Sequence, residues 1–311
     1  MLALKPRYIL SGLIVYMAAL FYLHFSFDIG LNKFLPAFFI VGIGLTFIAW
    51  LITKDLSEPG TNITFKKEIG VVIALVTWIV FYITYGGNLV DRIIPGAWIK
   101  NDRVYSFVIL VRKLLIFVVL PYLVYRFWGF SSKDFGLREC KLKFFGEKSI
   151  LLFLLTSIVS ILFQYYLSNA GKTIQNIGIT THQMIFGIPL AFSWLFLEAG
   201  LVEEFFFRAL LQSRLSVLLK SATGGIIVTS IIFGLSHAPG LYLRSAESEG
   251  ISEQLPFLFF CSYTIVYMSI AGIFLGVIWN KTRNLWLVMA VHAGFDLLPF
   301  LGSFFHTWHI K

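Results

Sequence analysis

The sequence predicts an all-α fold, a polytopic transmembrane helix bundle of eight or nine spans with a polar cavity inside the membrane. Of the 311 residues, 58% are hydrophobic and only 13% are charged, whereas about a quarter of the residues of a soluble domain are charged. The mean hydropathy is +0.83. The apolar residues also occur in blocks of about 20, the length that crosses ~30 Å of hydrocarbon.

Nine apolar segments follow one another along the chain. They lie near residues 8–25, 34–53, 69–86, 104–125, 149–168, 184–215, 224–240, 257–280 and 285–305. The fourth contains Arg112 and Lys113, so we expect it to be tilted, interfacial or interrupted. The sixth is too long for a simple span and is predicted to be a long or bent helix. The basic, apolar N-terminus is followed at once by further spans, so we interpret it as a retained first helix.

The connecting segments indicate topology and organisation. Fifteen Lys and Arg residues fall on one side of the predicted spans and seven on the other, which favours a cytoplasmic N-terminus and an external C-terminus. The polar connector 128–149 separates N-terminal helices of unknown role (1–128) from a second bundle (129–311) that contains every candidate catalytic residue. We therefore expect a multi-pass protein of the cell membrane.

The charge and the cysteine content limit which partners and which metal or disulfide sites the sequence predicts. The net charge of +9 is typical of cytoplasmic loops that contact anionic lipid, so we predict membrane lipid and no nucleic acid as partners. Cys140 and Cys261 form neither a disulfide framework nor a metal-ligand pattern. No cofactor is predicted, and the sequence does not indicate an oligomeric state.

Ionisable side chains within apolar segments are the candidate functional residues, because each costs ~3 kcal/mol or more at membrane depth. The C-terminal half contains Glu203, Glu204, Arg208, His237, His292 and Asp296. Glu204 and Arg208 are four residues apart and can pair on one helix face, while Glu203 is rotated by about 100°. Alternatively, both glutamates only neutralise Arg208 or a neighbouring cation.

The histidines also allow two interpretations. His237 is either a satisfied histidine near a helix end or a catalytic group. His292 and Asp296 share a helix face, so they form either a structural hydrogen bond or part of a polar cavity. We expect that cavity between segments 184–215, 224–240 and 285–305, open to one membrane face so that water and a peptide can enter.

Three motifs, in order and on separate predicted helices, resemble a known family. EEFFFR (203–208), FGLSH (233–237) and HAGFD (292–296) match E-E-x-x-x-R, F-x-x-x-H and H-x-x-x-[N/D]. With KDFGLRE (133–139) and the segment 271–296, they are similar to the CPBP (Abi) family of CAAX proteases and bacteriocin-processing enzymes, which includes the Rce1-type prenyl-protein endopeptidases. The resemblance covers about residues 130–305.

The resemblance implies a glutamate-dependent intramembrane endopeptidase that acts on a membrane-associated peptide or protein, with CAAX-type C-terminal processing as one such activity. Glu203 would deprotonate the attacking water with help from His237. His292 and Asp296 would stabilise the oxyanion that develops on the substrate carbonyl. Glu204, Arg208 and Phe233 would support the site.

Two features depart from the prenyl-protease pattern. Asp296 stands where asparagine is common, and an ionised aspartate would repel an oxyanion unless it is protonated or orients His292. The second motif continues as SHAPG, without the further histidines of eukaryotic prenyl proteases. An unprenylated substrate is therefore at least as well supported as a prenylated one.

Two alternatives stay open. Glu203, His237 and His292 could bind zinc as a catalytic His₂Glu site, although the helical H-E-x-x-H pattern is absent. The protein could instead be a non-proteolytic membrane scaffold or immunity-type protein of the same family. A transporter is disfavoured, because no pair of Gly/Pro-broken helices occurs at matching positions in two halves.

Overall fold

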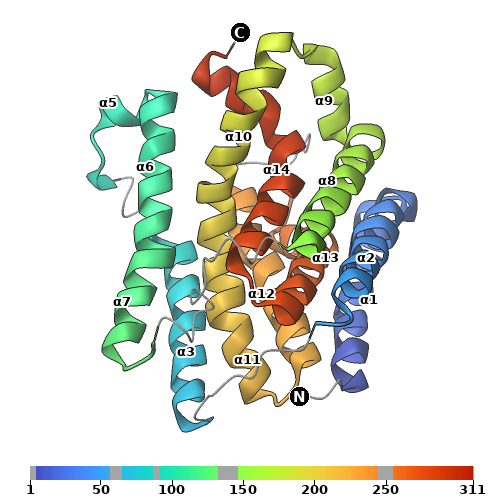
Figure 1. The fold of residues 1–311 in the computed structure, drawn as a ribbon, viewed down its shortest axis with the longest axis vertical. Helices are drawn as coiled ribbons and strands as arrows, with labels where there is room; N and C mark the ends of the chain where they lie inside the picture. Colours follow the sequence, from blue (N-terminus) through green and yellow to red (C-terminus); the bar gives the residue numbers. More distant parts are fainter. Residues whose placement is uncertain (1–4, 57–64, 87–91, 132–145, 244–254, 311) are drawn as a thin grey trace. The chain divides into compact units, whose positions relative to one another are not determined.

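The structure, a computed structural model, describes residues 5–56, 65–86, 92–131, 146–243 and 255–310, which are helical where they have regular structure and contain no strand (Figure 1). Nine helices within these ranges are long and apolar enough to cross a membrane. They are Pro6–Phe27, Leu31–Thr53, Glu68–Tyr85, Asp102–Phe127, Glu147–Leu167, Gln183–Leu218, Ala222–Leu243, Phe257–Thr282 and Leu285–Trp308. The predicted all-α polytopic bundle is thus confirmed, and the chain is a multi-pass integral membrane protein.

Two predicted segments can be compared closely with these helices. The fourth, with Arg112 and Lys113, is one helical run, Asp102–Phe127. The sixth is the longest, Gln183–Leu218, which confirms that it exceeds a simple span. The KDFGLRE stretch (133–139) and Cys140 lie outside the described residues.

Several of the long helices include wider, π-helical turns with i→i+5 hydrogen bonds, which occur frequently at functional sites. These turns are η2 (Ala37–Leu45), η3 (Tyr82–Gly86), η4 (Leu115–Val119), η7 (Gln183–Gly187), η8 (Phe196–Leu201) and η9 (Glu204–Gln212). The sixth span therefore runs as η7, α10 (Ile188–Leu195), η8, η9 and α11 (Ser213–Leu218), with both motif glutamates close to the junction of η8 and η9.

The chain forms two compact units that interleave along the sequence. Unit 1 comprises residues 1–47, 57–92 and 210–281, and unit 2 comprises residues 48–56, 93–209 and 282–311. This division follows packing and does not test the predicted boundary between 1–128 and 129–311, which stays a prediction.

Unit 1 contains α1 (Pro6–Phe27), α3 (Phe65–Phe81), α11, α12 (Ala222–Leu243) and most of α13 (Phe257–Thr282). Helix α11 packs against α3 and α12, and α12 also packs against α1. A buried ion pair joins α11 to α3, with Arg214 Nη1 3.1 Å from Glu68 Oε1. A Cβ on Gly234 of α12 would lie 2.8 Å from the carbonyl oxygen of Thr264, so glycine allows α12 and α13 to approach closely.

Unit 2 is built around α14 (Leu285–Trp308), which packs against α8 (Glu147–Leu167), α9 (Asn169–Ile177), α10 and η8 (Figure 1). Its other helices are α6 (Asp102–Leu114), α7 (Leu120–Phe127) and the short α5 (Gly96–Ile99). Two elements remain: η1 (Leu31–Lys33), a 3₁₀ turn, lies in unit 1, and α2 (Thr46–Thr53) lies mostly in unit 2. Helix α14 begins after Asn284, whose side chain accepts a hydrogen bond from the Leu287 N–H.

Candidate functional site

Glu204 and Arg208 form the buried ion pair that their four-residue spacing predicts. Arg208 Nε donates to Glu204 Oε2 over 2.9 Å, and neither side chain is exposed. Glu203, the neighbouring residue, has a different environment, since 20% of its side chain is exposed. The two adjacent glutamates therefore divide into one sealed carboxylate and one that solvent can reach.

Glu204 also contacts His292, which the sequence could not predict. His292 Nδ1 lies 2.7 Å from Glu204 Oε1, so one carboxylate bridges a guanidinium and an imidazole. With Glu204 ionised, Nδ1–H is the donor, and this bond fixes the orientation of the ring. Glu204, Arg208 and His292 thus form one continuous hydrogen-bonded group inside unit 2.

The other ring nitrogen of His292 faces the more accessible carboxylates. Its Nε2 atom lies 3.2 Å from Asp296 Oδ2 and 3.9 Å from Glu203 Oε2. The Asp296 side chain is 23% exposed, similar to Glu203. His292 therefore separates the sealed Glu204 from two carboxylates that water can reach, and the predicted proximity of His292 and Asp296 is observed.

Close helix packing makes these contacts possible. Gly200 precedes Glu204 by one turn, and Met289 precedes His292 by about one turn. A Cβ on Gly200 would lie only 2.8 Å from the Met289 carbonyl oxygen, so the absence of a side chain allows η8 to reach α14. Helix α14 is also held by α8, since Gln164 of α8 donates to the Phe295 carbonyl oxygen over 2.6 Å.

His237 and Phe233 lie on α12, in unit 1. His237 Nδ1 is 2.8 Å from the Phe233 carbonyl oxygen, and the two rings meet edge to face with centroids 4.8 Å apart. Since a carbonyl oxygen only accepts, Nδ1–H is the donor, which leaves Nε2 as the basic nitrogen of a neutral ring. Phe233 therefore contacts His237 through both its backbone and its ring, and its role in supporting the site stays a prediction. The cavity predicted among the three segments draws on both units and stays a prediction.

The arrangement of the acidic and histidine side chains bears on metal binding. Within the described ranges, no group of three or more His, Cys, Asp or Glu side chains is arranged to hold a metal ion. In unit 2, Glu204 already bonds to Arg208 and His292, so it does not supply a ligand. The zinc alternative with Glu203, His237 and His292 includes His237 of unit 1 and remains open.

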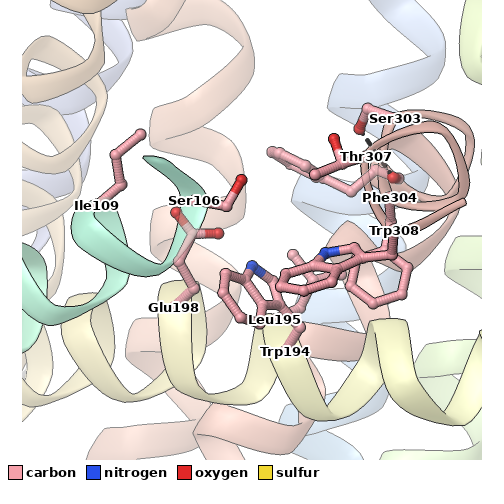
Figure 2. Close-up of a pocket in the computed structure, with 10 residues that line it drawn as sticks. Ser106, Ile109, Trp194, Leu195, Glu198, Ser303, Phe304, Thr307 and Trp308 are labelled. Carbon is pink, nitrogen blue, oxygen red and sulfur yellow. Dashed lines mark hydrogen bonds between the residues drawn. The ribbon is translucent and has the colours of Figure 1, made fainter. Parts of the chain in front are cut away.

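A second polar group in unit 2 was missed by the sequence analysis. Lys113 of α6 pairs with Glu198 of η8, and both lie inside membrane spans. Glu198 also lines a cavity between α6, α10 and the end of α14 (Figure 2). The available signal was a third acidic residue in the sixth span, besides Glu203 and Glu204, together with the noted cations of the fourth span. Pairing over 85 residues cannot be inferred from spacing.

These observations define a helical membrane protein with a buried Glu–Arg–His group beside two accessible carboxylates. Residues 185–298 match the family described as type II CAAX prenyl endopeptidase, Rce1-like, in agreement with the predicted CPBP/CAAX protease family. The matched region includes all three motifs. It supports a CAAX-type intramembrane endopeptidase in general, and hence a hydrolase with a peptide or protein substrate in a lipid environment. Searches of curated proteins and of solved structures gave no match.

Proposed function

We propose that the protein is an intramembrane endopeptidase of the cell membrane in which Glu203 activates the water that hydrolyses a peptide bond. The observation that carries this proposal is the division of roles around His292. Glu204 is sealed and bonded to Arg208 and His292, whereas Glu203 and Asp296 lie near Nε2 and are partly exposed. A general base needs contact with water, so Glu203 fits that role and Glu204 does not.

The proposed reaction follows from these positions. Glu203 takes a proton from water while the water oxygen attacks the carbonyl carbon of the scissile peptide bond. The tetrahedral oxyanion needs a preorganised donor, and a proton on His292 Nε2 supplies one. Collapse of the intermediate breaks the C–N bond, and the proton held by Glu203 passes to the leaving amine. Carboxyl and amine products result, and Glu203 returns to its ionised form.

Asp296 and His237 complete the proposal. Asp296 Oδ2 lies close enough to His292 Nε2 to accept its hydrogen bond, so it orients the imidazole in the absence of substrate. On the resemblance described above, His237 assists Glu203 through the nitrogen opposite Phe233. Residues 129–311 form the catalytic bundle of this proposal. The aspartate at 296 and the SHAPG continuation leave both prenylated and unprenylated substrates in the proposal.

The test compares peptide termini in membranes that contain the wild-type protein, Glu203→Gln or the control Glu147→Gln, an exposed carboxylate at the start of α8. We expect new termini with the wild type and the control, and none with Glu203→Gln at equal abundance of folded protein. Termini that are unchanged by Glu203→Gln would refute the glutamate mechanism. A phenotype that persists in Glu203→Gln without any cleavage would instead support the scaffold alternative.

A further inference from the structure

The cavity beside Glu198 has about 160 Å³ of free volume and lies entirely within unit 2 (Figure 2). Its polar lining consists of the hydroxyls of Ser106, Ser303 and Thr307 and the carboxylate of Glu198. Trp194 and Trp308 form much of its wall, with ring centroids 5.1 Å apart. This volume has room for several water molecules, and the hydroxyls and carboxylate give them hydrogen-bond partners.

The depth of the ion pair indicates that the cavity is wet. Lys113 is eleven residues from the start of its span at Asp102, and Glu198 is fifteen residues from the start of its span at Gln183. At this depth, 29% of the Lys113 side chain and 16% of the Glu198 side chain remain exposed. Charged groups inside spans face a bundle interior or a water-filled space, because contact with lipid costs several kcal/mol. Since Glu198 lines the cavity, the cavity is the place where water would solvate the pair.

The hydroxyl groups that line the cavity are consistent with bound water. Ser106 Oγ donates to the Asp102 carbonyl oxygen over 2.7 Å, and Ser303 Oγ donates to the Phe300 carbonyl oxygen over 2.9 Å. Each hydroxyl proton is therefore used within its own helix. The oxygen atoms still accept hydrogen bonds, which a mobile water molecule can donate.

The position of the cavity indicates the face at which it opens. Trp308 is the last residue of α14, and Thr307 and Ser303 lie within the last two turns. Arg103, near the start of α6, donates from Nε to the Thr307 carbonyl oxygen over 3.2 Å. The cavity thus begins near the membrane face where α14 ends, which is the external face in the topology predicted from Lys and Arg counts.

The inner end of the cavity approaches the proposed catalytic group along two helices, the sixth span and α14. Glu198 precedes Glu203 by five residues, or about 7.5 Å of helix rise, and Phe300 follows Asp296 by four, or about 6 Å. Glu198 lies within the π-helical turn η8, which ends two residues before Glu203 and brings residues five apart closer to one side than an α-helix does. The inner lining therefore lies within about two turns of both accessible carboxylates.

We propose that this cavity is the water entrance to the His292 group, open at the membrane face where α14 ends. The proposal rests on the proposed hydrolytic function, because it assigns the route by which that reaction receives its water. Trp194 and Trp308 wall the entrance, and the Lys113–Glu198 pair lies at its inner, hydrated end.

Single cysteines in a Cys140→Ser, Cys261→Ser background test whether the cavity holds water. A membrane-impermeant, charged thiosulfonate should label Ser106→Cys and Ser303→Cys from the face where α14 ends. Ser193→Cys is the matched control, since Ser193 is exposed, adjoins Trp194 and does not line the cavity. Because thiolate forms in water and not in lipid, both lining positions should react at least about tenfold faster than the control. No labelling of either position, or labelling only from the opposite face, would overturn the proposal.

Cleavage by the labelled protein tests the entrance role. We expect a bulky adduct at Ser303→Cys to slow cleavage severalfold, with recovery when a reducing agent removes the adduct. Labelled protein that cleaves at the unlabelled rate would overturn the entrance role. Labelling is also measured in the Glu203→Gln variant, because labelling does not depend on catalysis. Lack of any cleavage by the unlabelled background would count against the proposed function, whereas lack of labelling would count against the entrance.

Discussion

Replacing Glu204 by glutamine should destabilise the protein strongly, whereas the same change at Glu203 should not. Glu204 lies at zero exposure between Arg208 Nε at 2.9 Å and His292 Nδ1 at 2.7 Å. Glutamine offers one carbonyl oxygen, so it can accept from only one of these donors, and its NH₂ group faces the other. The neutral side chain also leaves the buried Arg208 without this carboxylate.

The size of the effect follows from those losses. A hydrogen bond to a charged group contributes about 1.5–3 kcal/mol, and removing one partner of a buried ion pair costs about 3–5 kcal/mol. We expect Glu204→Gln to lower the free energy of unfolding by about 3 kcal/mol, or roughly 100-fold in the unfolding equilibrium. Glu203 is partly solvated and 3.9 Å from His292, so Glu203→Gln should cost about 1 kcal/mol or less.

Unfolding of purified protein by sodium dodecyl sulfate in mixed micelles measures both variants against the wild type. Equal stability of Glu204→Gln and the wild type would refute the view that Glu204 is the structural member of the pair. A loss in Glu203→Gln as large as in Glu204→Gln would refute the assignment of Glu203 as the accessible base. Both variants are expected to lose cleavage, so stability is the property that separates them.

Two further substitutions test the packing and the orientation of His292. Gly200→Ala places a Cβ 2.8 Å from the Met289 carbonyl oxygen, so it should cost about 1–3 kcal/mol in the same unfolding assay and reduce cleavage. Gly96→Ala is its control, with no atom within 4 Å of the added Cβ, and an equal loss there would contradict the argument. Asp296→Asn keeps an acceptor for His292 Nε2 and should retain kcat/KM within about tenfold, whereas Asp296→Leu should lose most of it. Equal activity of the two Asp296 variants would show that this hydrogen bond is not needed.

The sequence predicted interactions within a helix better than interactions between helices. Glu204 and Arg208, like His292 and Asp296, are four residues apart, so the helical period alone places each pair on one face. The length and hydropathy of the spans also follow directly from the thickness of a bilayer. These features depend on local geometry and composition, which the sequence contains explicitly.

Contacts between helices depend on rotation and depth, and helical spacing does not determine these. The bond between His292 and Glu204 joins residues 88 apart. It requires the close approach at Gly200, a position that the motifs did not single out. The pairing of Lys113 with Glu198 and the cavity beside it were missed for the same reason, although Lys113 had been noted as a cation inside a span.

Peptide cleavage by the purified protein in liposomes, with and without an excess of metal chelator, tests the central claim most directly. A water activated by Glu203 requires no metal, so cleavage should persist in chelator. Cleavage should disappear in the Glu203→Gln variant, once the unfolding assay has shown that this variant is folded. Cleavage at the wild-type rate by Glu203→Gln, or activity that chelator removes and zinc restores, would contradict the account.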